Sequence, residues 1–191
     1  MAAPEPERTQ RWLTLSNGLT LMRLVAAPFF YWLIVNHLWS AACLVFWLAV
    51  VSDVVDGRLA RSRGETSALG GILDHASDAT FVTLGNLALV QTGWAPALLP
   101  ALIVAAFLQY VLDSRILAGR ELHASFLGRW NGIFYFVPPG VIVTREALGL
   151  AVPSDQIISV VGWVLVVSTL LSMGDRLTNL ISLVRKNRTH R

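Results

Sequence analysis

Charged residues are scarce in this chain of 191 residues: only 14% are Asp, Glu, Lys or Arg, whereas 54% are hydrophobic and the mean hydropathy is +0.58. An ordinary soluble domain carries about 25% charged residues, so this composition excludes that class and indicates an integral membrane protein. Cysteine is rarer still, because Cys43 is the only one. A single cysteine excludes an internal disulfide and a cysteine-rich metal site, and Cys43 is interpreted as a small buried apolar residue.

Other familiar signals are missing as well. The N-terminal segment has no basic region leading into a short apolar stretch with a cleavage site, so we expect no cleaved signal peptide. No fixed-period repeat occurs, and no basic patch interleaved with aromatic residues indicates nucleic-acid binding. We expect a single membrane domain over residues 1–191, with a polar or interfacial segment at 1–15 and a basic tail at 185–191.

Long apolar runs are abundant. About 20 mainly apolar residues are enough to cross the bilayer as a helix. Their connections are short, which favours one bundle that uses nearly the whole chain. We therefore expect an all-α integral membrane protein with six transmembrane helices near residues 18–38, 41–62, 70–93, 95–117, 131–150 and 155–184.

Basic residues are distributed unevenly over the predicted loops. With an even number of spans both termini lie on one side, and the loops of the opposite side carry only Arg145. The side of the termini collects Arg8, Arg11, Arg58, Arg61, Arg63, Arg115, Arg120, Arg129, Arg185, Lys186, Arg188 and Arg191. By the positive-inside rule, both ends are expected in the cytoplasm and the chain in the cell inner (cytoplasmic) membrane.

Four aspartates interrupt the apolar pattern around the loop between the second and third predicted spans. Asp53 and Asp56 are three residues apart, and Asp74 and Asp78 are four apart, so each pair lies on one face of its helix. The pairs are nearly symmetric about Glu65. An antiparallel helical hairpin would therefore bring all four carboxylates to one depth near the cytoplasmic surface.

Such a group of acids is costly unless a cation binds to it. Each ionised Asp at the centre of a membrane helix costs about 2.5–3.5 kcal/mol on insertion scales. Facing carboxylates also repel one another. Hard divalent cations bound through oxygen resolve both problems, and two such ions about 3.5–4 Å apart are a known device for displacement at phosphorus.

Small and basic residues flank the aspartates. Gly57, Ala60 and Gly70 leave room for a flat ligand to approach the backbone, and Arg61 is suited to fork onto a phosphate. Small residues in membrane helices also serve close helix packing, and arginines on the inner side also serve topology. The residues alone leave these alternatives open.

The order of these residues resembles the signature of the CDP-alcohol phosphatidyltransferase family. The matching positions are Asp53, Asp56-Gly57, Ala60-Arg61, Gly70, Asp74 and Asp78. The resemblance implies that the four aspartates bind two divalent metal ions, Mg²⁺ or Mn²⁺, and that Asp78 is also the catalytic base. It further implies that the small residues and Arg61 contact the CDP part of the substrate.

A second stretch, Leu15 to Pro28, is similar to the opening of the phosphatidylglycerophosphate synthases and the related cardiolipin synthases of that family. This similarity implies that Asn17 and Thr20 lie near the nucleotide and that Arg23 lies near the inner membrane surface. A helix cap at Asn17 and a topology charge at Arg23 are the alternative interpretations.

The resemblance implies transfer of a phosphatidyl group from CDP-diacylglycerol to an alcohol with release of CMP, by a homodimer active in phospholipid synthesis. Glycerol 3-phosphate is the expected acceptor; cardiolipin, phosphatidylinositol phosphate and phosphatidylserine synthesis are the alternatives. We expect Arg115, Arg129 and Arg176 to bind an acceptor phosphate. Family members that use glycerol phosphate have a glycine-lysine-x-lysine-threonine element, where this chain has Arg129, Asn131 and Gly132 instead.

An ion transporter is the rival from another class, because acids inside a membrane often mark ion pathways. A transporter would carry acids across the whole membrane depth, with broken helices or repeats. All four aspartates instead lie near one side of the membrane. The sequence therefore favours the enzyme.

Overall fold

We describe a computed structural model of the chain, which covers residues 15–63, 68–116 and 126–189, with side chains for 18, 20–54, 73–113 and 126–182. Within these ranges every regular element is a helix. The helices are α1 (Leu15–Val35), α2 (Trp39–Arg63), α3 (Ala68–Gln91), α4 (Leu98–Ile116), α5 (Phe126–Phe134), α6 (Val137–Leu148) and α7 (Asp155–Thr189). The prediction of an all-α protein is confirmed for these residues.

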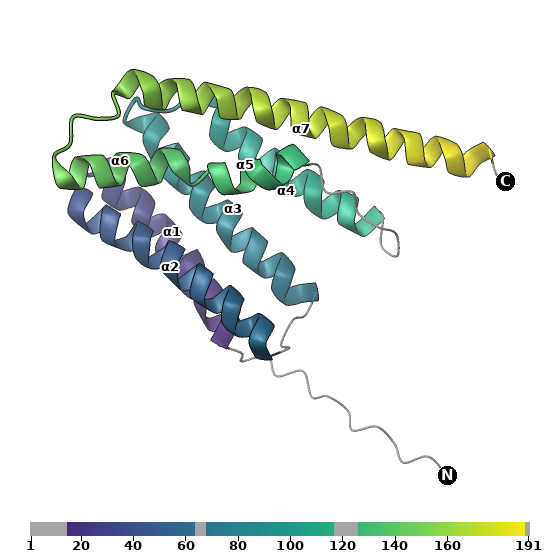
Figure 1. Cartoon of the computed structure of the whole chain (residues 1–191), viewed down its shortest axis with the longest axis horizontal. Helices are drawn as coiled ribbons and strands as arrows, with labels where there is room; N and C mark the ends of the chain where they lie inside the picture. The colour runs from purple at the N-terminus through teal and green to yellow at the C-terminus, as the bar shows by residue number, and fades with distance from the viewer. Residues whose placement is uncertain (1–14, 64–67, 117–125, 190–191) are drawn as a thin grey trace, which may run out of the picture.

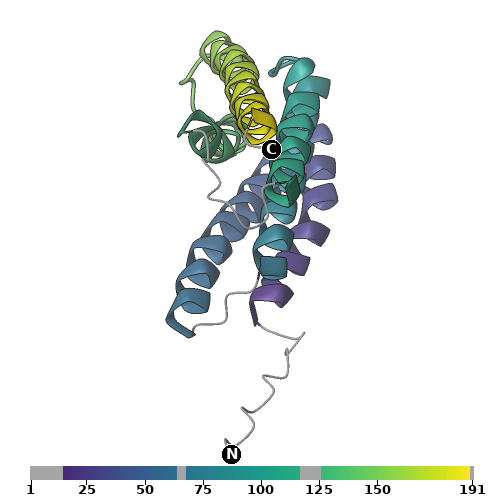
Figure 2. The ribbon, with the colours of Figure 1, turned by 90° about the vertical axis from the view of Figure 1, so that its right-hand side faces the viewer.

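Helix α1 lies against both α2 and α3, α6 packs on α2, and α7 packs on α4 and α5 (Figures 1 and 2). The chain reverses its direction between α1 and α2, between α2 and α3, between α3 and α4, and between α4 and α5. It reverses once more between α6 and α7 (Figure 1). Helices α2 and α3 diverge toward the C-terminal end of α2 and the N-terminal end of α3 (Figure 2).

Four phenylalanines form an aromatic layer that joins α1, α2, α3 and α6. The ring of Phe30 stacks on that of Phe81 with the centroids 4.8 Å apart, and the ring of Phe46 lies 5.8 Å from that of Phe30. Phe136 completes the layer at 6.3 Å from Phe81. Gly140 allows the close approach of α6, because a Cβ there would lie 2.5 Å from the Phe46 ring. The layer fixes the relative heights of the helices that carry the site.

The predicted fifth span over 131–150 differs from the structure, where two helices cover this stretch, α5 and α6. Pro138 and Pro139 lie in the first turn of α6, where proline is tolerated because the first backbone amides of a helix need no partner. Neither proline can donate to the carbonyls of Phe134 and Tyr135 in the preceding turn. The helix therefore breaks between Phe134 and Val137.

Asn86 compensates for this break. Its side chain is fully buried on α3, and its Nδ2 donates to the Tyr135 carbonyl at 3.0 Å, which is the carbonyl that Pro139 cannot reach with a hydrogen bond. The Tyr135 hydroxyl in turn lies 2.8 Å from Oγ1 of Thr169 on α7. Helices α3 and α7 thus hold the α5–α6 junction in place.

Arg145 fixes the connection between α6 and α7. Its guanidinium is 2.7 Å from the Glu146 carboxylate and 2.6 Å from that of Asp155, and it donates to the Pro153 carbonyl at 2.8 Å. It also lies 5.5 Å above the Trp94 ring. Only 7% of Arg145 is exposed, so this arginine is an internal partner and not a loop charge.

One helical stretch among the described residues, Asp155–Ser182, is long and apolar enough to cross a membrane by length and composition alone. Shorter apolar stretches run over Thr20–Val35, Trp39–Val54 and Leu98–Asp113. Large apolar residues are exposed along the helices, among them Val25, Leu44 and Leu171, each with more than 60% of its surface exposed. The number of spans stays a prediction.

Replacement of Asn86 by leucine should lower the free energy of unfolding by about 1–3 kcal/mol, because the Tyr135 carbonyl loses its partner while buried. Asn36→Leu is the matched control, since Asn36 is exposed just after α1 and its side chain donates to the Trp32 carbonyl in the last turn of that helix. Thermal unfolding in detergent, followed by tryptophan fluorescence, measures both. Equal melting temperatures for the two variants would contradict the assigned role of Asn86.

Candidate active site

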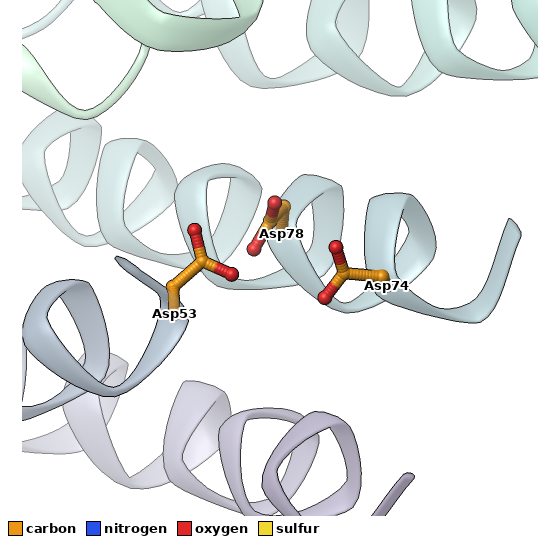
Figure 3. Close-up of side chains that lie close together, drawn as sticks. All are labelled: Asp53, Asp74 and Asp78. Carbon is orange, nitrogen blue, oxygen red and sulfur yellow. The ribbon is translucent and has the colours of Figure 1, made fainter. Parts of the chain in front are cut away.

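Asp53 of α2 and Asp74 and Asp78 of α3 lie close together and form what we call the aspartate cluster (Figure 3). Each contributes one carboxylate oxygen, and these three oxygens lie within 4.8 Å of one another. The side chains of Asp53 and Asp74 are 41% and 43% exposed, whereas that of Asp78 is 26% exposed. The cluster is therefore open on one side and deepest at Asp78.

Arg23 of α1 binds all three members of the cluster. Its Nη2 donates to Asp53 at 2.6 Å, and its Nη1 donates to Asp78 at 2.6 Å and to Asp74 at 3.2 Å. The arginine is only 3% exposed. A charge buried to this degree needs paired partners, and the planar guanidinium is suited to reach carboxylates on two different helices.

The aromatic layer explains why these side chains meet. Arg23 lies seven residues before Phe30 and Asp53 seven residues after Phe46, so each is about two helical turns from the layer. Asp78 lies about one turn before Phe81 on α3. Ser77, which is 1% exposed, accepts from Arg23 at 3.2 Å and donates to the Asp74 carbonyl at 2.8 Å.

The predicted convergence of acids from the second and third spans is thus confirmed for Asp53, Asp74 and Asp78. The side chain of Asp56 lies outside the described residues. The packing differs from the predicted hairpin, because α1 lies against both α2 and α3, while α2 and α3 diverge. The carboxylates converge on an arginine from a third helix.

Sequence reasoning assigned Arg23 only to the membrane surface and so missed this role. One signal was available. An arginine inside an apolar helix is costly unless it finds a partner in the bundle, and the four aspartates were the obvious candidates. The spacing of Arg23 does not reveal which acids it binds, since that depends on how α1 packs.

The aspartate cluster fits a divalent cation. Oxygen ligands on opposite sides of a Mg²⁺ or Ca²⁺ ion lie about 4–5 Å apart, and the oxygens of the cluster lie within 4.8 Å of one another. Three ionised carboxylates and one guanidinium sum to two negative charges, which one divalent cation would balance. Arg23 provides part of this balance by itself.

A cavity of about 1090 Å³ extends from the cluster into the bundle. Arg23, Asp53 and Asp78 line it, and much of the remaining wall is apolar. Further polar residues on the wall are His75, Gln109, Tyr110, Arg129, Asn131, Tyr135, Thr144, Arg145, Thr169, Ser172 and Arg176. The cavity is large enough for a sizeable ligand and offers the carboxylates of Asp53 and Asp78 to it.

Of the predicted acceptor residues, Arg129 and Arg176 line this cavity. The guanidinium of Arg176 lies 5.5 Å above the Tyr110 ring. Gly128 makes room for it, because a Cβ there would lie 2.7 Å from Nη2 of Arg176. The side chain of Arg115 lies outside the described residues.

Most of the residues predicted to contact CDP are ones whose side chains the structure does not describe. The side chains of Gly57, Ala60, Arg61, Gly70 and Asn17 lie outside the described residues. Thr20 is described, half-buried on α1 one turn before Arg23, and it is not part of the cavity wall. The CDP assignments stay predictions.

Known proteins resemble the chain over most of its length. The family model for CDP-alcohol phosphatidyltransferase matches residues 13–173. The chain is 40% identical over 81 residues to the cardiolipin synthase (CMP-forming) of Streptomyces coelicolor, which covers 39% of this chain and 38% of that protein.

Two further relatives match a longer part of the chain. Identity is 35% over 155 residues with a cardiolipin synthase (CMP-forming) / mitochondrial hydrolase fusion protein of Schizosaccharomyces pombe, covering 71% of the chain and 26% of that protein. Identity is 32% over 130 residues with a chloroplastic CDP-diacylglycerol–glycerol-3-phosphate 3-phosphatidyltransferase of Oryza sativa, covering 67% of the chain and 38% of that protein. The chain thus spans less than half the length of these relatives.

Replacement of Arg23 by methionine should destabilise the metal-free protein by about 3 kcal/mol, because three partly exposed carboxylates lose their shared counter-charge. Addition of Mn²⁺ should restore most of the loss in melting temperature. Mn²⁺ should also bind the variant about tenfold more tightly than wild type in calorimetry, since the cation no longer competes with the guanidinium.

Arg145→Met is the matched control, because Arg145 is equally buried and paired with two carboxylates at a different place. It should destabilise the protein without rescue by Mn²⁺. Equal rescue of both variants, or none for Arg23→Met, would show that Arg23 does not share its ligands with a metal.

Proposed function

The chain belongs to the CDP-alcohol phosphatidyltransferase family, and on that premise we propose that it transfers the phosphatidyl group of CDP-diacylglycerol to an alcohol and releases CMP. The observation that carries the proposal is the convergence of Asp53, Asp74 and Asp78 at the edge of a large cavity. The printed names of the relatives, cardiolipin synthase and CDP-diacylglycerol–glycerol-3-phosphate 3-phosphatidyltransferase, support the same reaction class.

The aspartates would hold two divalent ions, Mg²⁺ or Mn²⁺. Asp53, Asp74 and Asp78 are the ligands whose side chains the structure describes, and Asp56, one helical turn after Asp53, is the fourth in this proposal. When bound, such ions supply positive charge to the diphosphate of a CDP-linked substrate, which lowers the cost of attack at phosphorus. Arg23 keeps the carboxylates together on the side of α1.

The reaction is a displacement at phosphorus. The oxygen of the acceptor hydroxyl forms a bond to the phosphorus on the diacylglycerol side, and the bond from that phosphorus to the bridging oxygen breaks. CMP leaves with the bridging oxygen. Asp78 accepts the proton of the hydroxyl, a role that suits it because it is the most deeply placed acid of the cluster and lines the cavity.

The remaining part of the substrate would lie against the small residues of α2 and α3. We assign the CDP contacts to Gly57, Ala60, Arg61, Gly70, Asn17 and Thr20. Small side chains let a nucleotide approach the backbone, and an arginine can bind a phosphate through two parallel hydrogen bonds. The acceptor would bind on the opposite wall, where Arg129 and Arg176 lie.

We further propose six spans in the cell inner membrane, with α5 and α6 together forming the fifth. The repeated reversals of the chain and the exposed apolar residues of the helices support this arrangement. The internal ion pairs of Arg145 with Glu146 and Asp155 explain why the side that otherwise lacks basic residues contains one arginine. Both termini and the aspartate cluster would then face the cytoplasm. A homodimer is part of the proposal.

Purified protein with CDP-diacylglycerol and Mn²⁺ should release CMP when the right acceptor is supplied. The panel contains glycerol 3-phosphate, phosphatidylglycerol, inositol phosphate and serine. Chromatographic detection of CMP measures the reaction, and chelation of the metal should stop it. Folded protein that releases no CMP with any of these acceptors would refute the proposed activity.

Asp74→Asn should lower turnover at least about 100-fold, since loss of even a group behind a metal ligand often costs 10- to 100-fold. The variant should stay folded, because Asp74 is 43% exposed and makes the longest of the Arg23 contacts. Asp155→Asn is the control, as Asp155 is exposed and pairs with Arg145 away from the cluster. Near-normal turnover in Asp74→Asn would remove Asp74 from the metal site.

A further inference from the structure

The aspartates and Arg176 lie on parts of the bundle that pack in different clusters. Phe30 and Phe81 belong to a buried cluster that unites α1, α2 and α3, the helices of Arg23 and the aspartates. Met173, less than one turn before Arg176 on α7, packs against a second buried cluster around residues of α4 and α7. The distance across the cavity therefore depends on contacts between these two parts.

A ring contact joins the two parts beside the aspartate cluster. Val82 of α3 packs in the second buried cluster, but it lies seven residues, about two helical turns, after His75. The His75 ring meets the ring of Tyr110 on α4 edge to face, with the centroids 5.7 Å apart. This geometry is favourable for aromatic rings. Because His75 directly follows Asp74, the contact ties α4 to the turn of α3 that carries a predicted metal ligand.

The same tyrosine ring supports Arg176. The guanidinium of Arg176 lies 5.5 Å from the centroid of the Tyr110 ring, within the range of cation–π attraction. Asp113, three residues after Tyr110 and only 8% exposed, attracts Arg176 electrostatically. Residues three apart lie on one face of a helix, so α4 holds the guanidinium with a ring and a carboxylate.

Gly128 of α5 limits the space in which the guanidinium can lie. A Cβ at this position would lie 2.7 Å from Nη2 of Arg176 and 3.0 Å from Oγ of Ser172. The guanidinium therefore occupies space that any other side chain at position 128 would fill. His75, Tyr110, Gly128 and Arg176 all line the cavity that also contains Asp78.

Such contacts matter because arginine has a long and flexible side chain. A free arginine loses rotamer freedom when it binds an anion, and this loss weakens the binding. A guanidinium that is already held by a ring and by a neighbouring backbone avoids most of the loss. Reactions also depend steeply on placement, since a shift of about 1 Å in a bound group can cost 100-fold in rate.

We propose that Tyr110 is a positioning residue: with Gly128 it holds the guanidinium of Arg176 at the cavity wall, and through His75 it ties this cation to the helix of Asp74 and Asp78. The inference rests on the proposed function, in which the acceptor binds at the wall of Arg176. It adds the residues that fix this wall relative to the aspartate cluster.

The first experiment removes the ring or keeps it. Tyr110→Leu should raise the KM for the acceptor that supports CMP release about 3- to 30-fold, the range expected for loss of a cation–π contact. The KM for CDP-diacylglycerol should stay within about twofold. Tyr110→Phe keeps the ring and should have the wild-type KM. An unaltered acceptor KM in an active Tyr110→Leu variant would overturn the positioning role and leave the proposed function intact.

A double-mutant cycle tests whether Tyr110 acts through Arg176. Arg176→Met should raise the acceptor KM at least as much as Tyr110→Leu does. Adding Tyr110→Leu to Arg176→Met should change the KM by less than about twofold, because the ring then has no guanidinium to hold. Effects that multiply in the double variant would show that Tyr110 acts independently, and would overturn the inference.

Gly128→Ala tests the same placement without removing any group, and it replaces Tyr110→Leu if that variant does not fold. It should raise the acceptor KM about 3- to 30-fold, because the new methyl group displaces the guanidinium. Gly174→Ala is the matched control, since a Cβ there meets no atom within 4 Å and Gly174 is not on the cavity wall. Equal KM values for the two alanine variants would contradict the assigned role of Gly128.

His75→Leu and His75→Phe test the link to α3. The leucine variant should raise the acceptor KM about 2- to 10-fold, and the phenylalanine variant, which keeps an aromatic ring, should restore it. Trp94→Leu is the control for loss of a ring in general, because the Trp94 ring lies at the same 5.5 Å from Arg145. It should lower the melting temperature without changing the acceptor KM.

Binding of inorganic phosphate to the metal-free protein measures the placed cation without turnover. Titration followed by phosphorus NMR should show binding to the wild type and to Tyr110→Phe, and binding about 3- to 30-fold weaker to Tyr110→Leu. Equal phosphate affinity in all three proteins would overturn the inference. A wild type that releases no CMP but shows this dependence on the ring would refute the proposed function and not the placement of Arg176.

Discussion

Mutual repulsion of the carboxylates inside an apolar bundle is the constraint on which this structure depends. Asp53, Asp74 and Asp78 meet from two helices that diverge, and the guanidinium of Arg23 is what joins them. Arg23 is buried because α1 packs between its partners, and α1 is held there by the stacking of Phe30 on Phe81. The position of α1 and the charge balance of the aspartate cluster therefore depend on each other.

The same bundle also stabilises the break in the helix between Phe134 and Val137. Two prolines leave carbonyls without partners, and an asparagine from a distant part of the chain binds one of them. The break also gives α5 its own position against α7, where the Ser168 hydroxyl holds the Asn131 amide. A local defect in the helix thus shapes the wall on which we place the acceptor.

Much of the candidate site was predictable from the sequence. The spacing of the aspartates follows helical periodicity and places each pair on one face of its helix, whereas the convergence of the pairs also depends on Arg23 of α1. The helical content followed from long apolar runs. The break at Pro138 and Pro139 could also have been predicted, because proline removes a backbone hydrogen-bond donor. The apolar composition around the two prolines instead favoured one continuous span.

The sequence by itself determined the family, the helical class and the identity of the acids, since these depend on composition and on spacing along a single helix. Only the tertiary structure decided that Arg23 binds the acids and that Asn86 donates to the Tyr135 carbonyl at the break in the helix. It also decided that Gln109, Asn131 and Arg176 line the same cavity. Those contacts join residues that are tens of positions apart. They depend on how whole helices pack, and no local pattern encodes that packing.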